Sequence, residues 1–398
     1  MLPQNEQKTR FNHHVEQITL SATKQMPILA AKVGGCVSLG QGVPSFPTPK
    51  HIIDAMIQAL NDDPSVGKYS LQPGLQDLRV AISEYLKSEK GLNYDPDTEV
   101  LVTVGAMGGL AEAFLAILNE KDEVILPEPI YASYIEQVHL AGGTPVFVSL
   151  RKADWSLDIK AIANAISPRT KAVVICNPSN PTGAVYDKAT LIALSKIVRE
   201  KNIFLIIDET YDYLIYDDRK HFCPVSLEGM KARSIVINSF SKKYALTGWR
   251  VGYVAAEVSI MTQIVKVHDA TAICAPTPGQ YAALIAMTGP QACVKKMNQK
   301  LLQRRQLVLD RMDRLSKWFD FIAPEGAFYL MARWRSDTMT SVTLAERLIK
   351  EAKVVTIPGS SFGPGGEGHL RISFGGNENE LNEAFDRLEV WTNNTDPS

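Results

Sequence analysis

Short runs of apolar residues alternate with longer amphipathic stretches through the middle of the chain. The short runs are rich in valine and isoleucine and predict buried strands, whereas apolar positions that recur every three or four residues predict helices. Strands are expected at 100–104, 123–126, 144–148, 172–176, 203–208, 235–238 and 251–255, and helices at 109–118, 131–140, 159–166 and 188–199. This order predicts an α/β fold with a large domain, in which helices flank a mostly parallel sheet on both faces.

The pattern changes on either side of this region. Helical spacing also occurs at 51–61 and 75–86, and residues 1 to about 32 predict an arm with at most one short helix. Later helices are expected at 280–287, 292–315, 344–352 and 378–392, with strands at 328–331, 354–357 and 370–374. This mixture predicts a smaller α+β domain. We therefore expect an arm and part of the small domain at 1–48, the large domain at 49–290 and the small C-terminal domain at 291–398.

The composition narrows the class of partner. The 398 residues include 42 basic and 43 acidic side chains, and this balance removes the electrostatic argument for binding nucleic acid or a membrane surface. A small molecule is the expected partner. The five cysteines are scattered without Cys-x-x-Cys spacing, so we expect no disulfide frame, no metal site, and residence in the cytoplasm. No apolar run approaches the ~18 residues of a membrane span, and residues 1–25 lack the apolar core of a signal peptide.

The segment after the expected strand at 235–238 has an unusual combination of side chains. Residues 239–252 read Ser-Phe-Ser-Lys-Lys-Tyr-Ala-Leu-Thr-Gly-Trp-Arg-Val-Gly, so hydroxyls, two lysines and an arginine follow the carboxyl end of a strand. Open α/β sheets place their ligand sites at that edge. A solvated basic loop is the structural alternative.

Two further loops favour a ligand site through their backbone geometry. Residues 105–109, Gly-Ala-Met-Gly-Gly, open a helix and offer free N–H groups to a phosphate. They match neither GxGxxG nor GxxxxGK[ST], so nucleotide binding is the weaker alternative. Residues 177–183 form a double Asn-Pro turn, which either fixes amide side chains for binding or serves as a structural turn.

Charged side chains within apolar strands provide the second kind of signal. Asp208 ends a very apolar strand, where a carboxylate needs a cationic partner, and Tyr211 follows in the same loop. Arg371 lies within another apolar strand, where a guanidinium needs an anion, and a structural ion pair is the alternative. Gly42 would let a carboxylate approach the backbone closely, with a simple turn as the alternative.

Together these groups describe a pocket for pyridoxal phosphate, with a phosphate cradle, a carboxylate for a protonated nitrogen, hydrogen-bond partners and a lysine. The motifs Asn-Pro-x-Asn-Pro-Thr-Gly, Asp-Glu-x-Tyr, Ser-x-Ser-Lys-x-Tyr with Gly-Trp-Arg-x-Gly, and Arg-Ile-Ser-Phe occur at 177–183, 208–211, 239–252 and 371–374. In their order and spacing, the chain resembles the class I/II aminotransferases of the fold type I pyridoxal phosphate enzymes. The resemblance extends from about residue 27 to residue 395.

The resemblance implies a role for each matching residue. Lys242, directly after Ser-x-Ser, would bind the cofactor covalently and move the substrate's Cα proton, and its pKa should be lowered. Asp208 would hold the ring nitrogen protonated. Asn180 and Tyr211 would bind the ring oxygen, and Tyr131 would pack against the ring. The phosphate would be bound by the backbone of Ala106 and Met107 and by Ser239, Ser241 and Arg250. The substrate would be bound by Gly42, Asn180 and Arg371. Tyr69 is similar to a tyrosine that reaches a neighbouring subunit's phosphate, which implies a homodimer with shared sites.

The implied activity is a ping-pong exchange in which an L-amino acid gives its nitrogen to the cofactor and a 2-oxo acid such as 2-oxoglutarate accepts it. Met107 stands where some aspartate-type relatives have a lysine, and residues 40–46 resemble the Gly-Gln-Gly-Phe-Pro-Asp-Phe of methionine- and kynurenine-using enzymes, with departures at Val43 and Ser45. We therefore expect a neutral, aromatic or methionine-like donor. Aspartate aminotransferase and a carbon–sulfur β-lyase of the same fold are the alternatives within the family. A nicotinamide dehydrogenase and a DNA-binding regulator are alternatives from other classes, and the short arm leaves no room for the regulator's helix-turn-helix.

Overall fold

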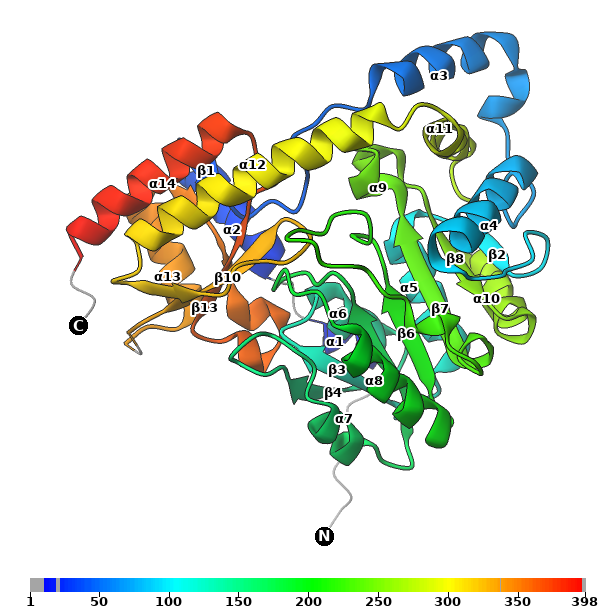
Figure 1. The fold of residues 1–398 in the computed structure, drawn as a ribbon, viewed down its shortest axis with the longest axis horizontal. Helices are drawn as coiled ribbons and strands as arrows, with labels where there is room; N and C mark the ends of the chain where they lie inside the picture. The colour runs from blue at the N-terminus through cyan, green and yellow to red at the C-terminus, as the bar shows by residue number, and fades with distance from the viewer. Residues whose placement is uncertain (1–10, 19–21, 337, 396–398) are drawn as a thin grey trace.

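The computed structural model describes residues 11–18, 22–336 and 338–395 (Figure 1). Residues 1–10 and 19–21 of the expected arm lie outside the described residues. The main feature is a seven-stranded sheet formed by β2 (Val100–Thr103), β3 (Glu123–Glu128), β4 (Thr144–Ser149), β5 (Thr170–Cys176), β6 (Phe204–Asp208), β7 (Ser234–Ser239) and β8 (Gly252–Ala256). Their order is β2-β8-β7-β6-β5-β3-β4, and β8 runs in the opposite direction to the other strands of this sheet. The predicted α/β fold is confirmed.

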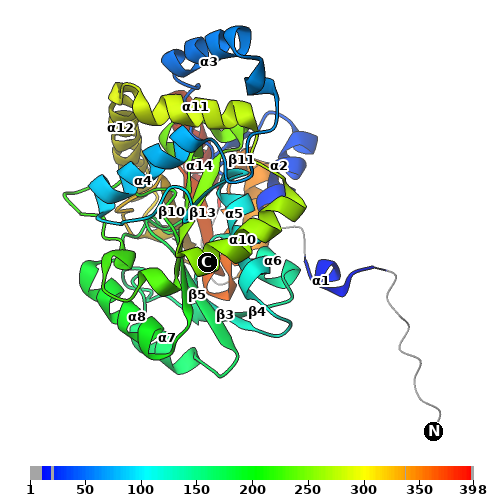
Figure 2. The same cartoon turned by 90° about the vertical axis from the view of Figure 1, so that its right-hand side faces the viewer.

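Two hydrophobic cores lie on the two faces of this sheet, because successive side chains of a strand point in opposite directions. In β5, Val174 and Cys176 face the core that contains α5 (Gly105–Ile117), α6 (Ala132–Leu140) and α10 (Val258–Thr271). Val173 and Ile175 face the other core, which contains α3 (Lys50–Asp62), α4 (Gln76–Lys90), α7 (Ile159–Ala165), α8 (Lys188–Glu200) and α11 (Thr277–Thr288). Figure 2 shows α7 and α8 on one side of the strands and α6 and α10 on the other. The central strands are therefore apolar on both faces, as their continuous apolar runs predicted.

The smaller α+β part contains a second sheet, of four antiparallel strands. These are β9 (Phe319–Phe321), β10 (Tyr329–Trp334), β12 (Ile357–Pro358) and β13 (His369–Ser373), in the order β12-β13-β10-β9. The accompanying helices are α12 (Ala292–Arg314), α13 (Ser341–Arg347), a π-helical turn (Leu348–Ala352) and α14 (Glu378–Asn393), and Figure 1 shows α12 and α14 packed side by side. The strand β1 (Val37–Ser38) pairs in parallel with β11 (Val354–Val355), which attaches an N-terminal segment to this part. The domain limits given above stay a prediction.

Several helices and one strand differ from the sequence-based expectation. The arm contains two helices, α1 (His13–Glu16) and α2 (Ala22–Val33), and α2 is longer than expected. Neither α10 nor β9 was predicted. The helix α5 begins at Gly105, whereas the sequence placed its start at residue 109. Glycine has a low helix propensity, but a Cβ atom at Gly109 would lie 2.6 Å from Val254 Cγ2, so close packing of α5 on β8 outweighs that propensity.

The remaining elements are short. They are the one-turn helix α9 (Phe240–Lys243) and the 3₁₀ turns Pro64–Gly67, Pro224–Ser226, Lys231–Arg233, Thr247–Trp249, Gly359–Phe362 and Pro364–Gly366. None of the helices within the described residues combines the length and the apolar composition that crossing a membrane requires.

Candidate active site

A cavity of about 610 Å³ lies at the carboxyl ends of β5, β6 and β7. This is the sheet edge at which the sequence predicted a ligand site, and the volume suits a small molecule. The cavity brings together all but one of the predicted site residues: Gly42, Ala106, Met107, Tyr131, Asn180, Asp208, Tyr211, Ser239, Ser241, Lys242, Arg250 and Arg371. The remaining residue, Tyr69, has 79% of its surface exposed and does not line this cavity.

Asp208 ends β6 with its carboxylate buried in the cavity wall. One oxygen accepts the backbone N–H of Thr210 at 2.9 Å, and the other accepts the hydroxyl of Tyr134 at 2.7 Å. Burial raises the pKa of Asp208, while these hydrogen bonds oppose the rise. A cationic nitrogen placed beside this carboxylate would favour its ionised form further.

Lys242, on the one-turn helix α9, points into the same cavity. Its Nζ donates to the backbone carbonyl of Gly42 at 2.5 Å. Burial and the positive charges of Arg371 and Arg250 lower the pKa of Lys242 to about 8, while Asp208 opposes this effect. Near pH 7 roughly one such amine in ten is neutral, compared with about one in three thousand for an ordinary lysine. The sequence led us to expect this lowered pKa, and a neutral amine is the form that can act as a nucleophile and accept a proton.

We expect Lys242→Met to raise the free energy of unfolding of the ligand-free protein near pH 7. The unfolded chain binds the lysine proton with a pKa of 10.5 and the folded chain with a pKa of about 8, so the unfolded state holds more protons between these values. The destabilisation by Lys242 is therefore complete below about pH 8 and disappears as the pH rises to about 10.5. Urea unfolding of both proteins across this range tests the prediction, and a stability difference that does not change with pH would contradict it.

Arg371 lies on β13 and is 4% exposed. It donates to Asn180 Oδ1 at 3.1 Å and to the carbonyl of Gly40 at 2.7 Å, and the rings of Tyr329 and Phe362 flank the guanidinium. Among the described residues, no carboxylate forms an ion pair with Arg371, and its Nε has no hydrogen-bond partner. The alternative of a structural ion pair is therefore not supported by the part of the chain that the structure describes. A buried cation with only neutral partners favours an anionic ligand.

The cavity also contains hydrogen-bond donors that suit a phosphate. The N-terminal turn of α5 leaves its backbone N–H groups free and lies near Ser239, Ser241 and Arg250. A Cβ atom at Gly252 would lie 2.7 Å from the Ala106 nitrogen, so this glycine is what allows the helix terminus to come so close to β8. Arg250 Nη1 donates to the carbonyl of Thr247 at 2.8 Å, which restrains the position of the guanidinium.

Two tyrosines belong to the site although the sequence analysis did not select them. Tyr134 binds Asp208, and the hydroxyl of Tyr329 lies 2.9 Å from that of Tyr211. A Cβ atom at Gly42 would lie 2.7 Å from the Tyr329 hydroxyl, so the loop requires glycine there for this close approach. Tyr134 comes three residues after Tyr131, within the helix expected at 131–140, and this helical spacing was an available signal for the first tyrosine. No comparable local signal marked Tyr329.

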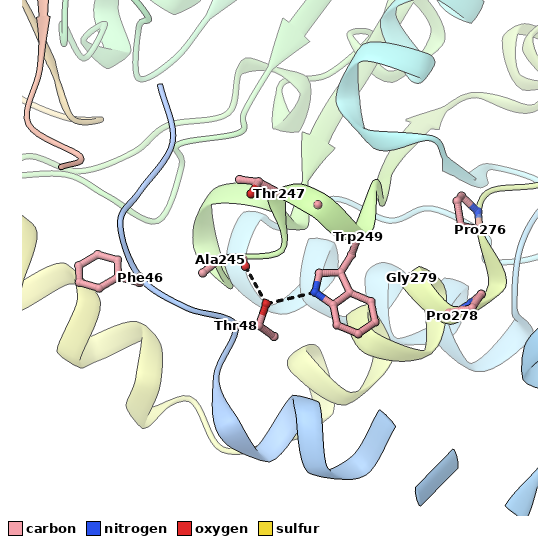
Figure 3. A pocket seen from close by; sticks show the side chains of 9 residues that line it. Phe46, Thr48, Ala245, Thr247, Trp249, Pro276, Pro278 and Gly279 are labelled. Carbon is pink, nitrogen blue, oxygen red and sulfur yellow. Dashed lines mark hydrogen bonds between the residues drawn. The ribbon is translucent and has the colours of Figure 1, made fainter. Parts of the chain in front are cut away.

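A second cavity, of about 520 Å³, borders the loop that follows Lys242 (Figure 3). There the hydroxyl of Thr48 donates to the carbonyl of Ala245 at 3.2 Å and accepts from Trp249 Nε1 at 3.1 Å. Thr247 lines both cavities. These two hydrogen bonds link the loop that follows Gly42 to the loop that follows Lys242. They therefore help to fix the positions of Gly42 and Lys242 relative to each other.

The comparisons with known proteins agree with this chemistry. The profile of the family described as "Aminotransferase class I and II" matches residues 35–388. Aromatic-amino-acid aminotransferase 2 of Thermococcus litoralis is 36% identical over 382 residues, covering 95% of this chain and 97% of that protein. Aspartate aminotransferase of Pyrococcus abyssi is 37% identical over 382 residues, with the same two coverages. The solved structure of aspartate aminotransferase from Thermus thermophilus with maleate has a TM-score of 0.90 and 33% identity, covering 96% of this chain and 99% of that chain.

Proposed function

This chain belongs to the class I and II aminotransferases, which are pyridoxal phosphate-dependent enzymes, and from that premise we propose its substrates and the roles of its residues. It transfers the amino group of a neutral, aromatic or methionine-like L-amino acid to a 2-oxo acid such as 2-oxoglutarate in a ping-pong exchange. The observation that carries this proposal is the buried Arg371, whose partners among the described residues are neutral, in one cavity with Lys242. An α-carboxylate is the anion that all donors and acceptors of such an exchange share.

The groups that line the cavity fit pyridoxal phosphate. Arg250, Ser239, Ser241 and the free N–H groups of Ala106 and Met107 would hold the phosphate, and Asp208 would hold the ring nitrogen. Asn180 and Tyr211 would bind the ring oxygen, and Tyr131 would pack against the ring. When bound, this cofactor supplies an aldehyde that joins to amines and a cationic ring that takes up the electron pair left at the substrate Cα.

The chain's own residues then bind the substrate and move its proton. Arg371 would bind the α-carboxylate, and its bonds to Asn180 and the Gly40 carbonyl fix the direction of the guanidinium. Lys242 would take the proton from Cα, since its lowered pKa leaves part of the amine neutral. Donor and acceptor would use the same Arg371 in turn, which supports a ping-pong exchange.

The residues that line the cavity support a donor with an uncharged side chain. The basic residues that line the cavity within the described chain are Lys242, Arg250 and Arg371, and the proposal gives each of them another task. Val43, Met107, Leu110 and Pro27 add apolar surface. The curated relatives include both an aromatic-amino-acid and an aspartate aminotransferase, so aspartate is the second candidate donor.

A panel of amino donors with 2-oxoglutarate as acceptor tests the donor class directly. The expected result is a higher kcat/KM for aromatic amino acids and methionine than for aspartate. A preference for aspartate would replace the proposed donor class with the second candidate. Release of pyruvate and ammonia from cystathionine without an oxo acid would instead support a carbon–sulfur β-lyase.

We expect Met107→Lys to shift the preference toward aspartate. The new ammonium group would meet the distal carboxylate of aspartate, and one charge-assisted contact corresponds to about a tenfold change in the kcat/KM ratio of aspartate to phenylalanine. Met107→Gln, which adds polarity without charge, is the matched control and should change this ratio less. If both variants keep the wild-type ratio, residue 107 does not face the substrate side chain.

The proposal also includes a homodimer with shared sites, and residence in the cytoplasm. Tyr69 and Leu71 are each 79% exposed on the loop between the turn Pro64–Gly67 and α4, which suits contact with a second copy. Tyr69 would then reach the partner's phosphate site. The unpaired state of the described cysteines supports a reducing compartment.

A further inference from the structure

The side chains at the end of β6 and in the turn that follows it point in two directions. Asp208 and Tyr211 line the cavity, whereas Glu209 and Asp212 turn away from it. These two carboxylates both form ion pairs with Lys90, the last residue of α4. All three side chains are buried, with at most 4% of any one exposed. We call Lys90, Glu209 and Asp212 the Lys90 cluster.

The cluster also reaches the loop that contains Lys242. Besides Lys90, Asp212 Oδ2 accepts the amide N–H of Asn238 and the hydroxyl of Tyr85, both at 3.1 Å. Asn238 Oδ1 in turn accepts the backbone N–H of Ser239 at 2.7 Å. One carboxylate therefore connects the turn of Asp208 and Tyr211 to the end of β7, from which Ser239, Ser241 and Lys242 follow.

Lys90 and Glu209 each favour the charged form of the other. Burial alone would lower the pKa of Lys90, but Asp212 and Glu209 hold this pKa well above the ordinary lysine value. Burial alone would raise the pKa of Glu209, but Lys90 and His221 hold this pKa well below the ordinary glutamate value. His221 Nε2 lies 3.1 Å from Glu209 Oε1 and completes the surroundings of that carboxylate.

Stability alone explains such a cluster poorly. Buried ion pairs are often no more stabilising than apolar side chains of the same volume, because desolvation offsets the attraction. Buried networks of ion pairs and hydrogen bonds do fix the relative positions of the segments that they join. A separate cavity of about 700 Å³, lined by Lys90, Asp212 and Lys243, lies next to the cluster. Neither Lys90 nor Asp212 lines the active-site cavity, so any effect on the reaction must pass through other residues.

We propose that the Lys90 cluster is a positioning device that holds the two halves of the cofactor cradle, Asp208 with Tyr211 and Ser239 with Lys242, at a fixed separation. This inference rests on the proposed function. The cluster acts only through the cradle, so its loss weakens cofactor binding and turnover. Arg371, on β13, has no bond to the cluster, so KM for the amino donor is expected to change little.

The test uses Asp212→Asn and the neutral, nearly isosteric triple variant K90M/E209Q/D212N. Removing all three charges together avoids leaving an unpaired buried charge, so the triple variant should fold. Either variant is expected to raise the Kd for pyridoxal phosphate and lower kcat at saturating cofactor, each by about tenfold, with KM for the donor nearly unchanged. Thermal unfolding of each cofactor-free protein is measured in parallel.

The matched control is K231M/E99Q, which removes a Lys–Glu pair with a 2.7 Å contact at the amino ends of β2 and β7, away from the site. It should change the unfolding temperature without changing Kd or kcat. The proposal is overturned if both cluster variants bind the cofactor and turn over like the wild type, or if the control loses affinity equally. Failure of the wild-type protein to bind pyridoxal phosphate would instead contradict the proposed function, which separates the two outcomes.

Discussion

Replacing Lys242 with alanine is expected to lower the rate of amino transfer by about 10³-fold or more. The variant loses both the amine that would join the cofactor and the base that would move the Cα proton, and general acid–base catalysis alone contributes ~10² to 10⁴-fold. The measurement is the single-turnover rate of oxo acid formation from a saturating amino donor. Reduction of the wild-type protein with borohydride in the presence of pyridoxal phosphate should attach the cofactor permanently to the peptide that contains Lys242. We call this attached cofactor the borohydride label.

Lys243→Ala is the matched control, since the neighbouring lysine has the same chemistry in a different place. Lys243 Nζ lies 4.3 Å from the centre of the Tyr85 ring and lines the separate cavity beside the Lys90 cluster. The variant should keep its single-turnover rate and its borohydride label. If the borohydride label of the wild-type protein is found on Lys243 instead of Lys242, the wrong lysine has been assigned.

Arg371→Ala should weaken every amino donor to a similar degree. The guanidinium would contact the α-carboxylate that all donors share, and a lost charge-assisted pair corresponds to ~2 to 4 kcal/mol in kcat/KM, mostly through KM. Steady-state kinetics with an aromatic donor, methionine and aspartate measure this loss. Equal losses across the three would locate the contact at the common carboxylate and not at the side chain.

Arg305→Ala provides the comparison for this prediction. Arg305 is 6% exposed, donates to the carbonyl of Pro324 at 2.8 Å and pairs with Asp217, and it does not line the cavity. Its loss should lower stability and leave KM near the wild-type value. If Arg371→Ala also left KM unchanged for all donors, Arg371 would not bind substrate.

Much of the site was predictable because it lies where strands end. The apolar runs located β5, β6 and β7, and the polar residues that follow each run, such as Asp208 and Lys242, had to meet at one edge of a parallel sheet. Arg371 was conspicuous for a different reason, because a charge within an apolar strand requires a compensating partner.

The features that escaped prediction depend on distant contacts. Tyr134 lies 74 residues from Asp208 in sequence, and Tyr329 lies 118 residues from Tyr211, so no local pattern connects these pairs. The antiparallel direction of β8 and the early start of α5 likewise follow from packing between elements. The glycine-rich start of α5 has a weak helical signal by itself.

Because β1 pairs with β11, an early segment of the chain can reach its final position only after a late segment has been synthesised. A nascent chain presents Val37 and Ser38, and the loop with Gly42, long before their neighbours Val354 and Val355 have been made. The sheet that contains Lys242 can assemble earlier, since domains generally fold as units during translation. Arg371 on β13, the residue proposed to bind the substrate carboxylate, is made only in the last stage of synthesis, so an incomplete chain would have the proposed cofactor cradle without the proposed carboxylate site.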